Sequence, residues 1–175
     1  MITGSAAYLT SDIVNENFAF YGTTLSGTPQ LRERWKRGVS LVEGSLGEAI
    51  GKIYVERHFP PAAKARMEGL VANLIEAYRH SINGLEWMSQ ETKTKAIAKL
   101  EKFRPKIGYP DKWRDYSALA ITDDDLFGNL ARVTKFERDF ALSKIGKPVD
   151  RDEWHMTPQT VNAYYNPLGN EIVFP

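Results

Sequence analysis

Apolar residues recur at intervals of three and four along most of this chain, which is the period of an amphipathic α-helix. The first stripe predicts a helix over residues 14–25 that Ser26-Gly27 ends. The second predicts a helix that Thr28 caps and that continues to Leu46, with a kink or an end at Gly44 or Gly47. The first quarter of the chain is therefore expected to be helical.

The middle of the chain keeps the helical period and adds clear start and stop signals. An apolar segment over residues 50–59 leads to Pro60-Pro61, which open a long helix that Asn83-Gly84 end. Ser89 is expected to cap the next helix, which Arg104-Pro105 break. The long helix carries one apolar stripe, made of Met67, Leu70, Leu74, Tyr78 and Ile82.

The pattern changes after Pro105, where shorter segments replace the helical period. Residues 106–110 predict a short strand or turn, and residues 111–120 an irregular connection. The acidic run 123–125 supplies a cap and favourable charge for a last helix, which ends before Gly146. We expect a domain boundary between residues 106 and 107. The predicted fold class is mainly α with a small β component.

The last sixteen residues predict a β-hairpin. Residues 160–165 are β-branched and aromatic, Asn166-Pro167 and Gly169-Asn170 supply turn chemistry, and residues 171–174 are extended again. The run Ile172-Val173-Phe174 is continuously apolar, which suits burial better than a free end. Expressed alone, the chain is therefore expected to associate or aggregate.

The first strand of this hairpin carries the candidate binding residues. Alternation places Asn162 and Tyr164 on one face, and Ala163 and Tyr165 on the other. Asn162 projects an amide, which both donates and accepts hydrogen bonds, beside an extended backbone. Spacing alone favours an amide that bonds to a neighbouring backbone group. It leaves open whether the two tyrosines line a cleft or simply pack.

Composition and charge exclude several classes of partner. The 175 residues are 42% apolar and 11% aromatic, which is enough for the core of one domain or parts of two. Lysine and arginine total 23 against 22 acidic residues, so the net charge of +1 creates no strong field toward nucleic acid or an anionic membrane. No apolar run approaches the length of a membrane span.

Other clusters of polar residues have structural explanations. A basic run at Lys93, Lys95, Lys99, Lys102, Arg104 and Lys106 is interleaved with acids, which favours a solvated helix face over a nucleic-acid site. The chain has no cysteine, and its three histidines are His58, His80 and His155. No two histidines stand four apart, so no zinc site with three protein ligands can be derived from the sequence.

The hairpin sequence resembles a known family. Residues 161–165 and 170–175 are similar to the neprilysin-like zinc metallopeptidases, which include endothelin-converting enzymes and bacterial oligopeptidases. Two further blocks, within residues 46–56 and 85–110, resemble the same family, so the resemblance covers nearly the whole chain. It implies a mostly helical cap-domain segment over 1–106, followed by the N-terminal part of a thermolysin-like α+β catalytic domain over 107–175.

The resemblance also implies a binding role for the hairpin, residues 160–174. The Asn162 side chain and the Ala163 carbonyl are expected to hold the backbone of an oligopeptide substrate, with Tyr164 and Tyr165 beside them. An extended peptide that adds to a strand edge gains main-chain hydrogen bonds that do not depend on its sequence. Spacing alone favours a hydrogen bond from the Asn162 amide to a neighbouring backbone group, whereas the resemblance favours a contact with the substrate.

Two features of the family are missing. Its zinc-binding helix, with the pattern His-Glu-x-x-His, is absent from these residues, so the zinc ligands and the remainder of the catalytic domain are expected beyond Pro175. This chain alone is therefore expected to be inactive. Animal members carry a cysteine after the Arg-Trp pair, whereas Gly38 follows Arg34–Arg37 here, which favours a bacterial-type member. The compartment stays open between cytoplasm and cell envelope or secretion.

These observations predict a segment of a zinc metalloendopeptidase that hydrolyses oligopeptides and contributes the strand that binds the substrate backbone. The alternative is a non-catalytic helical module, derived from such a peptidase, that binds peptides or a partner protein. Neither hypothesis involves nucleic acid, and neither requires a membrane segment in this chain.

Overall fold

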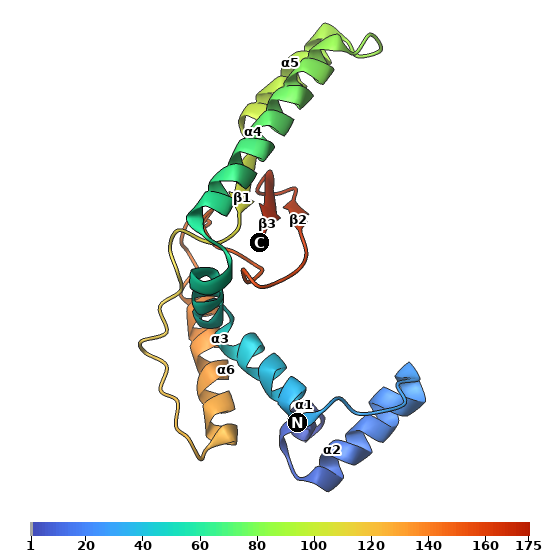
Figure 1. Ribbon diagram of the computed structural model, residues 1–175, viewed down its shortest axis with the longest axis vertical. Coiled ribbons are helices and arrows are strands. Elements are labelled where there is room, and N and C mark those ends of the chain that lie inside the picture. Colours follow the sequence, from blue (N-terminus) through green and yellow to red (C-terminus); the bar gives the residue numbers. More distant parts are fainter. Residues whose placement is uncertain (1) are drawn as a thin grey trace. The chain divides into compact units, whose positions relative to one another are not determined.

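Helices make up most of the computed structural model, which describes residues 2–175, with side chains described from Gly4 onward. Figure 1 shows these helices and one small sheet, which confirms the predicted fold class. The elements in chain order are α1 (Ile2–Ser5), η1 (Ala6–Tyr8), α2 (Ser11–Asn17), η2 (Phe18–Thr24), α3 (Arg34–His58), α4 (Pro61–Gly84), α5 (Gln90–Glu101), β1 (Arg104–Ile107), α6 (Leu126–Leu142), β2 (Tyr164–Asn166) and β3 (Glu171–Phe174).

The described residues form two compact units. One unit combines the chain up to Leu46 with Asp115–Pro148, and the other combines Gly47–Arg114 with Val149–Pro175. The predicted boundary between residues 106 and 107 concerns the domains of a complete peptidase and stays a prediction. The three strands all belong to the second unit.

The first predicted helix is present, but it begins earlier and changes type. α2 passes directly into η2, a π-helix. Hydroxyl side chains bond to carbonyls five residues earlier in this region: Thr24 Oγ1 donates to Ala19 O at 2.9 Å, and Ser26 Oγ donates to Tyr21 O at 2.8 Å. These bonds satisfy carbonyl groups that the wider π turn places differently from an α turn.

The predicted helix start at Thr28 is wrong. The backbone N–H of Thr28 donates to Gly22 O at 2.9 Å, and its carbonyl accepts a hydrogen bond from Thr23 Oγ1 at 3.2 Å. Gly27, with φ of +66°, turns the chain back just before. Thr28 therefore closes the preceding helix, and α3 begins only at Arg34.

Two capping predictions and one kink prediction are confirmed. Ser89 Oγ accepts a hydrogen bond from Thr92 N at 3.2 Å and starts α5. Asp125 Oδ1 accepts one from Gly128 N at 2.8 Å and starts α6. α3 is interrupted at Leu46, which has the non-helical angles φ −132° and ψ 32°, directly before Gly47.

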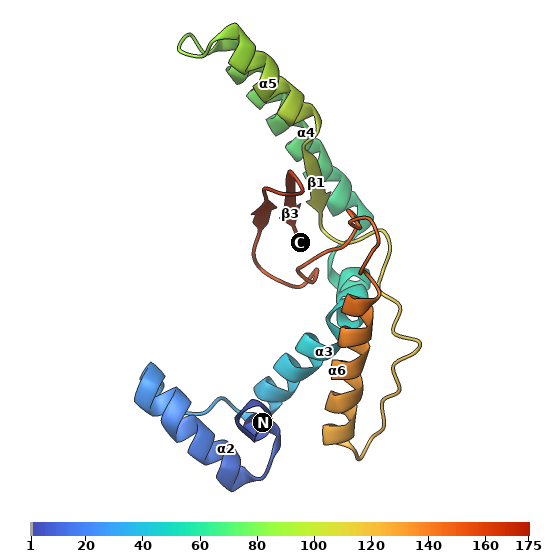
Figure 2. The ribbon, with the colours of Figure 1, turned by 180° about the vertical axis from the view of Figure 1, so that it is seen from behind.

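α4 and α5 lie side by side as an antiparallel pair in the second unit, as Figures 1 and 2 show. Within the described chain, the apolar stripe of α4 is only partly covered: Leu70, Leu74 and Tyr78 are 50%, 49% and 62% exposed. By contrast, the neighbouring Val71 is 4% exposed. The helical period is as predicted, but much of the apolar stripe remains in contact with solvent.

The sheet has the order β1-β3-β2. β1 pairs with β3 in parallel, with Ile107 opposite Phe174, and β2 pairs with β3 in antiparallel register, with Asn166 opposite Glu171. The predicted hairpin is thus present. Val173, at the centre of the sheet, is fully buried.

The first strand of the hairpin is shorter than predicted, since residues 160–163 precede β2 without joining the sheet. Continuing the register would bring Asn162 opposite Pro175, which has no backbone N–H to donate. Local hydrogen bonds also compete there, because Asn162 N donates to Thr160 O at 3.0 Å. The strict alternation of faces predicted from Asn162 onward therefore holds only from Tyr164.

Candidate functional site

The candidate site is the outer edge of β2 together with the segment that leads into it. Asn162 and Ala163 are both exposed in that segment, and Tyr164 and Tyr165 begin the strand. The Oδ1 atom of Asn162 accepts a hydrogen bond from Ala163 N at 2.8 Å. Its Nδ2 group has no protein partner in the described part of the chain, so this donor is free to meet a ligand.

The two edges of the sheet differ in their capacity to accept another strand. β1 contains Pro105, which has no N–H for strand pairing, and α4 packs against this strand. Lys64 of α4 donates to Tyr109 O at 3.1 Å, just after β1. β2 contains no proline. The β2 edge therefore lacks both of the features that obstruct the β1 edge.

Tyr164 points toward the polypeptide that precedes the hairpin. Its hydroxyl accepts a hydrogen bond from His155 N at 3.3 Å, and the two rings lie 6.1 Å apart. Burial raises the pKa of Tyr164, and the nearby carboxylates of Glu171 and Glu153 raise it further, against the opposite effect of the His155 backbone bond. The Tyr164 phenol therefore stays protonated to a higher pH than an exposed tyrosine.

Tyr165 lies on the opposite side of β2 and is 44% exposed. Its ring stacks on Phe103 at 6.4 Å, and Lys99 Nζ lies 5.9 Å from the ring centroid. Its hydroxyl donates to Asn170 Oδ1 at 3.2 Å. The two tyrosines thus pack against different neighbours and leave only part of each ring accessible.

The end of the hairpin loop is fixed by Asn170. This residue has φ of +48°, the left-handed region that Asn tolerates better than most residues. Its Nδ2 donates to Lys99 O at 2.9 Å, and its carbonyl accepts from Arg104 N at 2.9 Å. Together with the bond from Tyr165, these contacts attach the loop to the end of α5 and to β1.

A buried ion pair links the strands. Lys106 Nζ lies 2.9 Å from Glu171 Oε2, and the two side chains are 6% and 5% exposed. Lys106 also donates to Glu153 O at 2.9 Å, and Asn166 Nδ2 donates to Glu171 Oε1 at 3.2 Å. Every strand of the sheet and the preceding linker therefore contribute to one polar network.

This network changes the acidity of Glu171. Burial raises the pKa of the Glu171 carboxyl, but hydrogen bonds from Lys106 and Asn166 and the charges of Lys106 and Arg104 outweigh burial. The pKa of Glu171 consequently lies below its usual range. The ionised carboxylate is the form that the folded sheet stabilises.

Two glycines of α3 hold the segment before the hairpin. A Cβ on Gly47 would lie 2.6 Å from Thr157 Cγ2, and one on Gly51 would lie 2.7 Å from Pro158 Cδ. Gln159 Nε2 donates to Gly47 O at 3.1 Å. The hydrophobic pattern does not indicate this contact, although two glycines four apart on a helix face are a signal for close approach.

The described residues do not fit a zinc ion, since no group of three histidine, cysteine, aspartate or glutamate side chains comes together among them. The three histidines lie apart, with His58 beside Tyr54, His80 beside Glu76 and His155 beside Tyr164. Within the described chain, no helix is long and apolar enough to cross a membrane.

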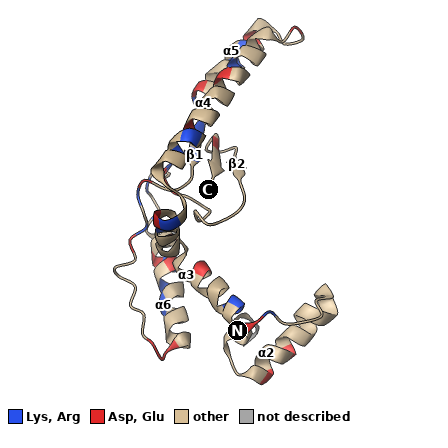
Figure 3. Ribbon diagram, viewed as in Figure 1, with Lys and Arg blue, Asp and Glu red and all other residues tan. Residues whose placement is uncertain are grey.

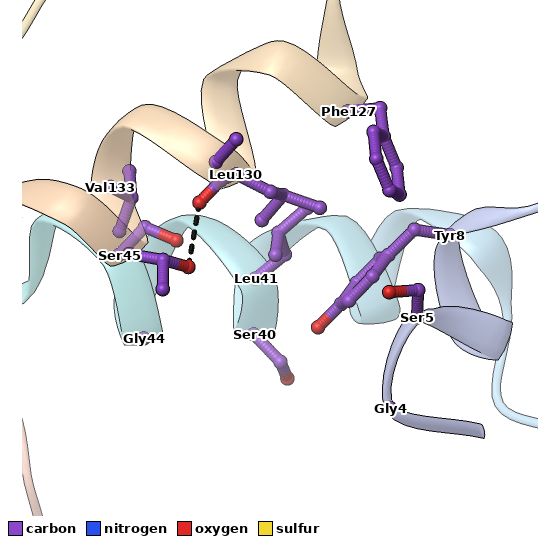
Figure 4. A pocket seen from close by; sticks show the side chains of 12 residues that line it. Gly4, Ser5, Tyr8, Ser40, Leu41, Gly44, Ser45, Phe127, Leu130 and Val133 are labelled. Atoms are coloured by element: carbon purple, nitrogen blue, oxygen red, sulfur yellow. Dashed lines mark hydrogen bonds between the residues drawn. The ribbon is translucent and has the colours of Figure 1, made fainter. Parts of the chain in front are cut away.

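A separate pocket of about 400 Å³ in the first unit carries little reactive chemistry (Figure 4). Leu41 of α3 lies toward Leu130 of α6, and Ser40 and Gly44 of α3 also line the pocket. Tyr8 is the one titratable residue in its described lining. We therefore assign no function to this pocket.

Comparisons with known proteins place these features in a family. The sequence pattern of peptidase family M13 matches residues 1–110. A zinc metalloproteinase of Streptococcus gordonii is 39% identical over 99% of this chain, and rabbit neprilysin is 34% identical over 90% of it. The crystal structure of the Mycobacterium tuberculosis zinc metalloprotease Zmp1 with an inhibitor superimposes with a TM-score of 0.91 at 60% identity over 99% of this chain.

The similarity covers only part of each relative. The chain spans 31% of the length of the Streptococcus gordonii protein, 21% of rabbit neprilysin and 26% of the Zmp1 chain. The matching region thus extends over almost all of this chain and under a third of each of these relatives.

Proposed function

Since this chain belongs to peptidase family M13, we propose that it forms part of a zinc-dependent metalloendopeptidase that hydrolyses oligopeptides. The family membership confirms the resemblance to neprilysin-like zinc metallopeptidases. Within that enzyme, we propose that residues 162–165 bind the substrate backbone. This role is narrower than the family assignment and rests on the geometry of the hairpin.

The observation that carries the proposed role is the free edge of β2. An edge strand presents unpaired N–H and C=O groups, and an extended peptide satisfies them by adding as a further strand. The other edge of this sheet is blocked by Pro105 and flanked by α4. A peptide can therefore add to this sheet only at the β2 edge.

Asn162 suits the role because of its position and its free donor. It is exposed just before the strand, and its Nδ2 group is available to donate to a peptide carbonyl. The carbonyl of the adjacent, exposed Ala163 is the proposed acceptor for a peptide N–H. A donor and an acceptor on adjacent residues match the alternation of groups along a peptide backbone.

Two of the relatives are named zinc metalloproteases, so a zinc ion is expected to take part in peptide hydrolysis. Its ligands would be residues other than 1–175. When bound, such a zinc ion activates a water molecule for attack on the peptide carbonyl. The part of the reaction assigned to this chain is to hold the peptide extended. By itself, the 175-residue polypeptide is accordingly expected to bind no stoichiometric zinc and to show no chelator-sensitive peptidase activity.

The test is an Asn162→Ala substitution in the whole gene product, assayed for chelator-sensitive hydrolysis of an oligopeptide. Loss of a hydrogen bond to the peptide should lower kcat/KM by about two- to tenfold, with zinc content unchanged. Asn73→Ala, on an exposed position of α4, is the matched control and should leave kcat/KM as it is. Equal kinetics for the Asn162 variant and the wild type would refute the binding role.

The non-catalytic alternative is separated from this proposal by the intact mass of the native protein, captured from its source cells and measured under denaturing conditions. A mass several times 19.8 kDa supports a complete peptidase. A mass near 19.8 kDa supports a binding module that lacks the catalytic residues.

A further inference from the structure

The six basic residues of the run between Lys93 and Lys106, on and after α5, differ in their surroundings. Four of its members have specific partners: Lys93 bonds to Asn83 O, Lys95 to Glu91, Arg104 to Asp152 and Lys106 to Glu171. Of these four, Lys93 bonds only to a neutral carbonyl. The other two, Lys99 and Lys102, have no carboxylate partner in the described chain, and Lys99 Nζ lies 5.9 Å from the Tyr165 ring centroid. Figure 3 shows acidic and basic positions interspersed along α4 and α5.

Lys99 and Lys102 share one side of α5, and this side lines a pocket of about 870 Å³. We call it the loop-end pocket, because it lies where the hairpin loop meets α5. Its lining comes from three segments: α5 with Lys95, Ala98, Lys99 and Lys102, the linker with Val149, Asp150, Arg151, Glu153 and His155, and the hairpin with Asn166 and Leu168–Glu171.

The described lining of the loop-end pocket carries a small excess of positive charge, with four basic against three acidic side chains. Arg151 Nη2 donates to the neutral carbonyl of Gly169 at 2.5 Å, so its guanidinium keeps its charge uncompensated. Glu171 also borders the pocket, but its charge is balanced by Lys106 at 2.9 Å. Lys99, Lys102 and Arg151 thus present three cations, against Asp150 and Glu153 on the linker. An anionic group is the ligand that this arrangement favours.

The pocket lies in line with the proposed peptide path. Asn166 is both the last residue of β2 and part of the pocket lining. An extended chain rises about 3.3 Å per residue, so the distance from Ala163 to Asn166 along the strand is about 10 Å, or three residues of a peptide lying beside it. A side chain three or four residues along the peptide from the one beside Ala163 therefore arrives at the mouth of the pocket.

We propose that the loop-end pocket is a specificity subsite that accepts an acidic side chain of the peptide bound along β2, with Lys99 and Lys102 as its cationic walls. This inference rests on the proposed function and extends it to the choice of substrate. The apolar side chain of Leu168, which is 98% exposed, stands at the rim and can cover the aliphatic part of a bound glutamate.

The experiment compares pairs of peptides that differ only by Glu or Gln at one position, with that position moved along the sequence. The whole gene product should cleave the Glu peptide with a kcat/KM about two- to fivefold above that of the Gln peptide, at one position only. The preference should shrink as salt is raised, because exposed ion pairs are screened.

The decisive variant is Lys102→Glu, which should reverse the preference, so that a Lys peptide is cleaved faster than the Glu peptide at that position. Lys99→Gln should reduce the preference for Glu without reversing it. Lys52→Glu is the matched control: it makes the same change of charge at an exposed position of α3 and should leave the ratio of Glu to Gln unaltered. Melting curves verify that each variant is folded.

The outcomes separate the two proposals. If none of the peptides is cleaved in a chelator-sensitive manner, the proposed function itself fails. If the peptides are cleaved but Glu and Gln are equivalent at every position, or if Lys102→Glu leaves the ratio unchanged, the subsite is refuted and the peptidase proposal stands. A preference for acid at every position alike also refutes it, because that result indicates long-range attraction by the whole surface.

Discussion

Asn170 has a left-handed backbone conformation and makes hydrogen bonds to α5, β1 and β2. Two substitutions distinguish the contribution of the backbone conformation to stability from that of the side-chain bonds. Asn170→Ala removes the side-chain bonds and places a Cβ-bearing, non-polar residue at φ of +48°, so we expect it to lower the free energy of unfolding by about 2 to 4 kcal/mol. Asn170→Gly loses the same bonds but accepts the backbone angle, so its loss should be about 1 to 2 kcal/mol.

Denaturant unfolding of the whole gene product measures both variants. The order of stability should be wild type, then Gly, then Ala. If the Ala variant were as stable as the Gly variant, the backbone angle would contribute nothing.

Glu171 makes the stability of the sheet sensitive to acid. Its pKa in the folded protein lies below the ordinary value of 4.5, so the folded state binds its proton less readily than the unfolded chain does. The stabilisation is therefore fully present above pH 4.5 and is lost as the pH falls through the lower, folded pKa. Thermal melts between pH 6 and 3, read for wild type and Glu171→Gln, should show a steeper decline for the wild type below about pH 4.5.

Replacing one partner of this pair has a different effect from replacing both. Lys106→Met leaves the Glu171 carboxylate buried and uncompensated, and should cost about 3 to 5 kcal/mol. Lys106→Met combined with Glu171→Met should recover much of that loss, since well-packed apolar residues often replace a buried pair at little cost. A double variant as unstable as the single one would contradict this account.

At the scale of residues, the sequence predicted local contacts better than distant ones. The caps at Ser89 and Asp125 depend on residues three positions away and were predicted correctly. The pair of Lys106 and Glu171 joins two segments far apart in the chain, and nothing in the spacing indicates it. The roles of Asn162, Ala163, Tyr164 and Tyr165 in binding stay predictions.

At the scale of elements, the close approach between α3 and the segment before the hairpin can be tested with alanine. Gly51→Ala places a Cβ 2.7 Å from Pro158 Cδ and 2.9 Å from Gln159 Oε1, so the segment must move. We expect a net loss of about 1 to 2 kcal/mol, because the steric cost exceeds the gain in helix propensity. A lower peptide affinity should accompany the loss, since this segment leads to Asn162.

Gly69→Ala in α4 is the control for Gly51→Ala. It makes the same chemical change within a helix, but no atom lies within 4 Å of the new Cβ. The unfolding free energy should therefore rise by about 0.5 to 1 kcal/mol. Equal and positive effects of both substitutions would show that the α3 contact does not constrain the segment.

Element boundaries were less predictable than element types. Helical periodicity correctly indicated α4, α5 and α6, but it could not show that Thr28 uses its backbone groups to end η2. It also could not show that residues 160–163 stay outside the sheet, because that depends on what stands opposite them. Strand limits are set by partners, and partners are not visible in a local pattern.

At the scale of the whole molecule, the described surface contains more exposed apolar area than its sequence pattern implied. Besides the α4 stripe, Phe20, Tyr21 and Leu25 of the first unit are 51%, 49% and 63% exposed. Apolar stripes of this kind are normally covered in a folded protein. The chain expressed alone should therefore self-associate, and sedimentation velocity at several concentrations measures this. The terminal strand gives no further reason for association, because β3 is paired on both sides and Val173 is buried. A monodisperse monomer with a cooperative melt would contradict the expectation.

The central position of β3 also affects the order of events during synthesis. β1 and β2 both pair with β3, and β3 follows both of them in the sequence, so no part of this sheet can form until Glu171–Phe174 have been made. After Ile107 the ribosome adds 67 residues to reach Phe174, which takes about 3 to 13 seconds at roughly 5 to 20 residues per second. β1 must wait through that interval without a partner, and Pro105 then limits wrong pairings of the nascent chain by withholding one N–H from any neighbouring strand.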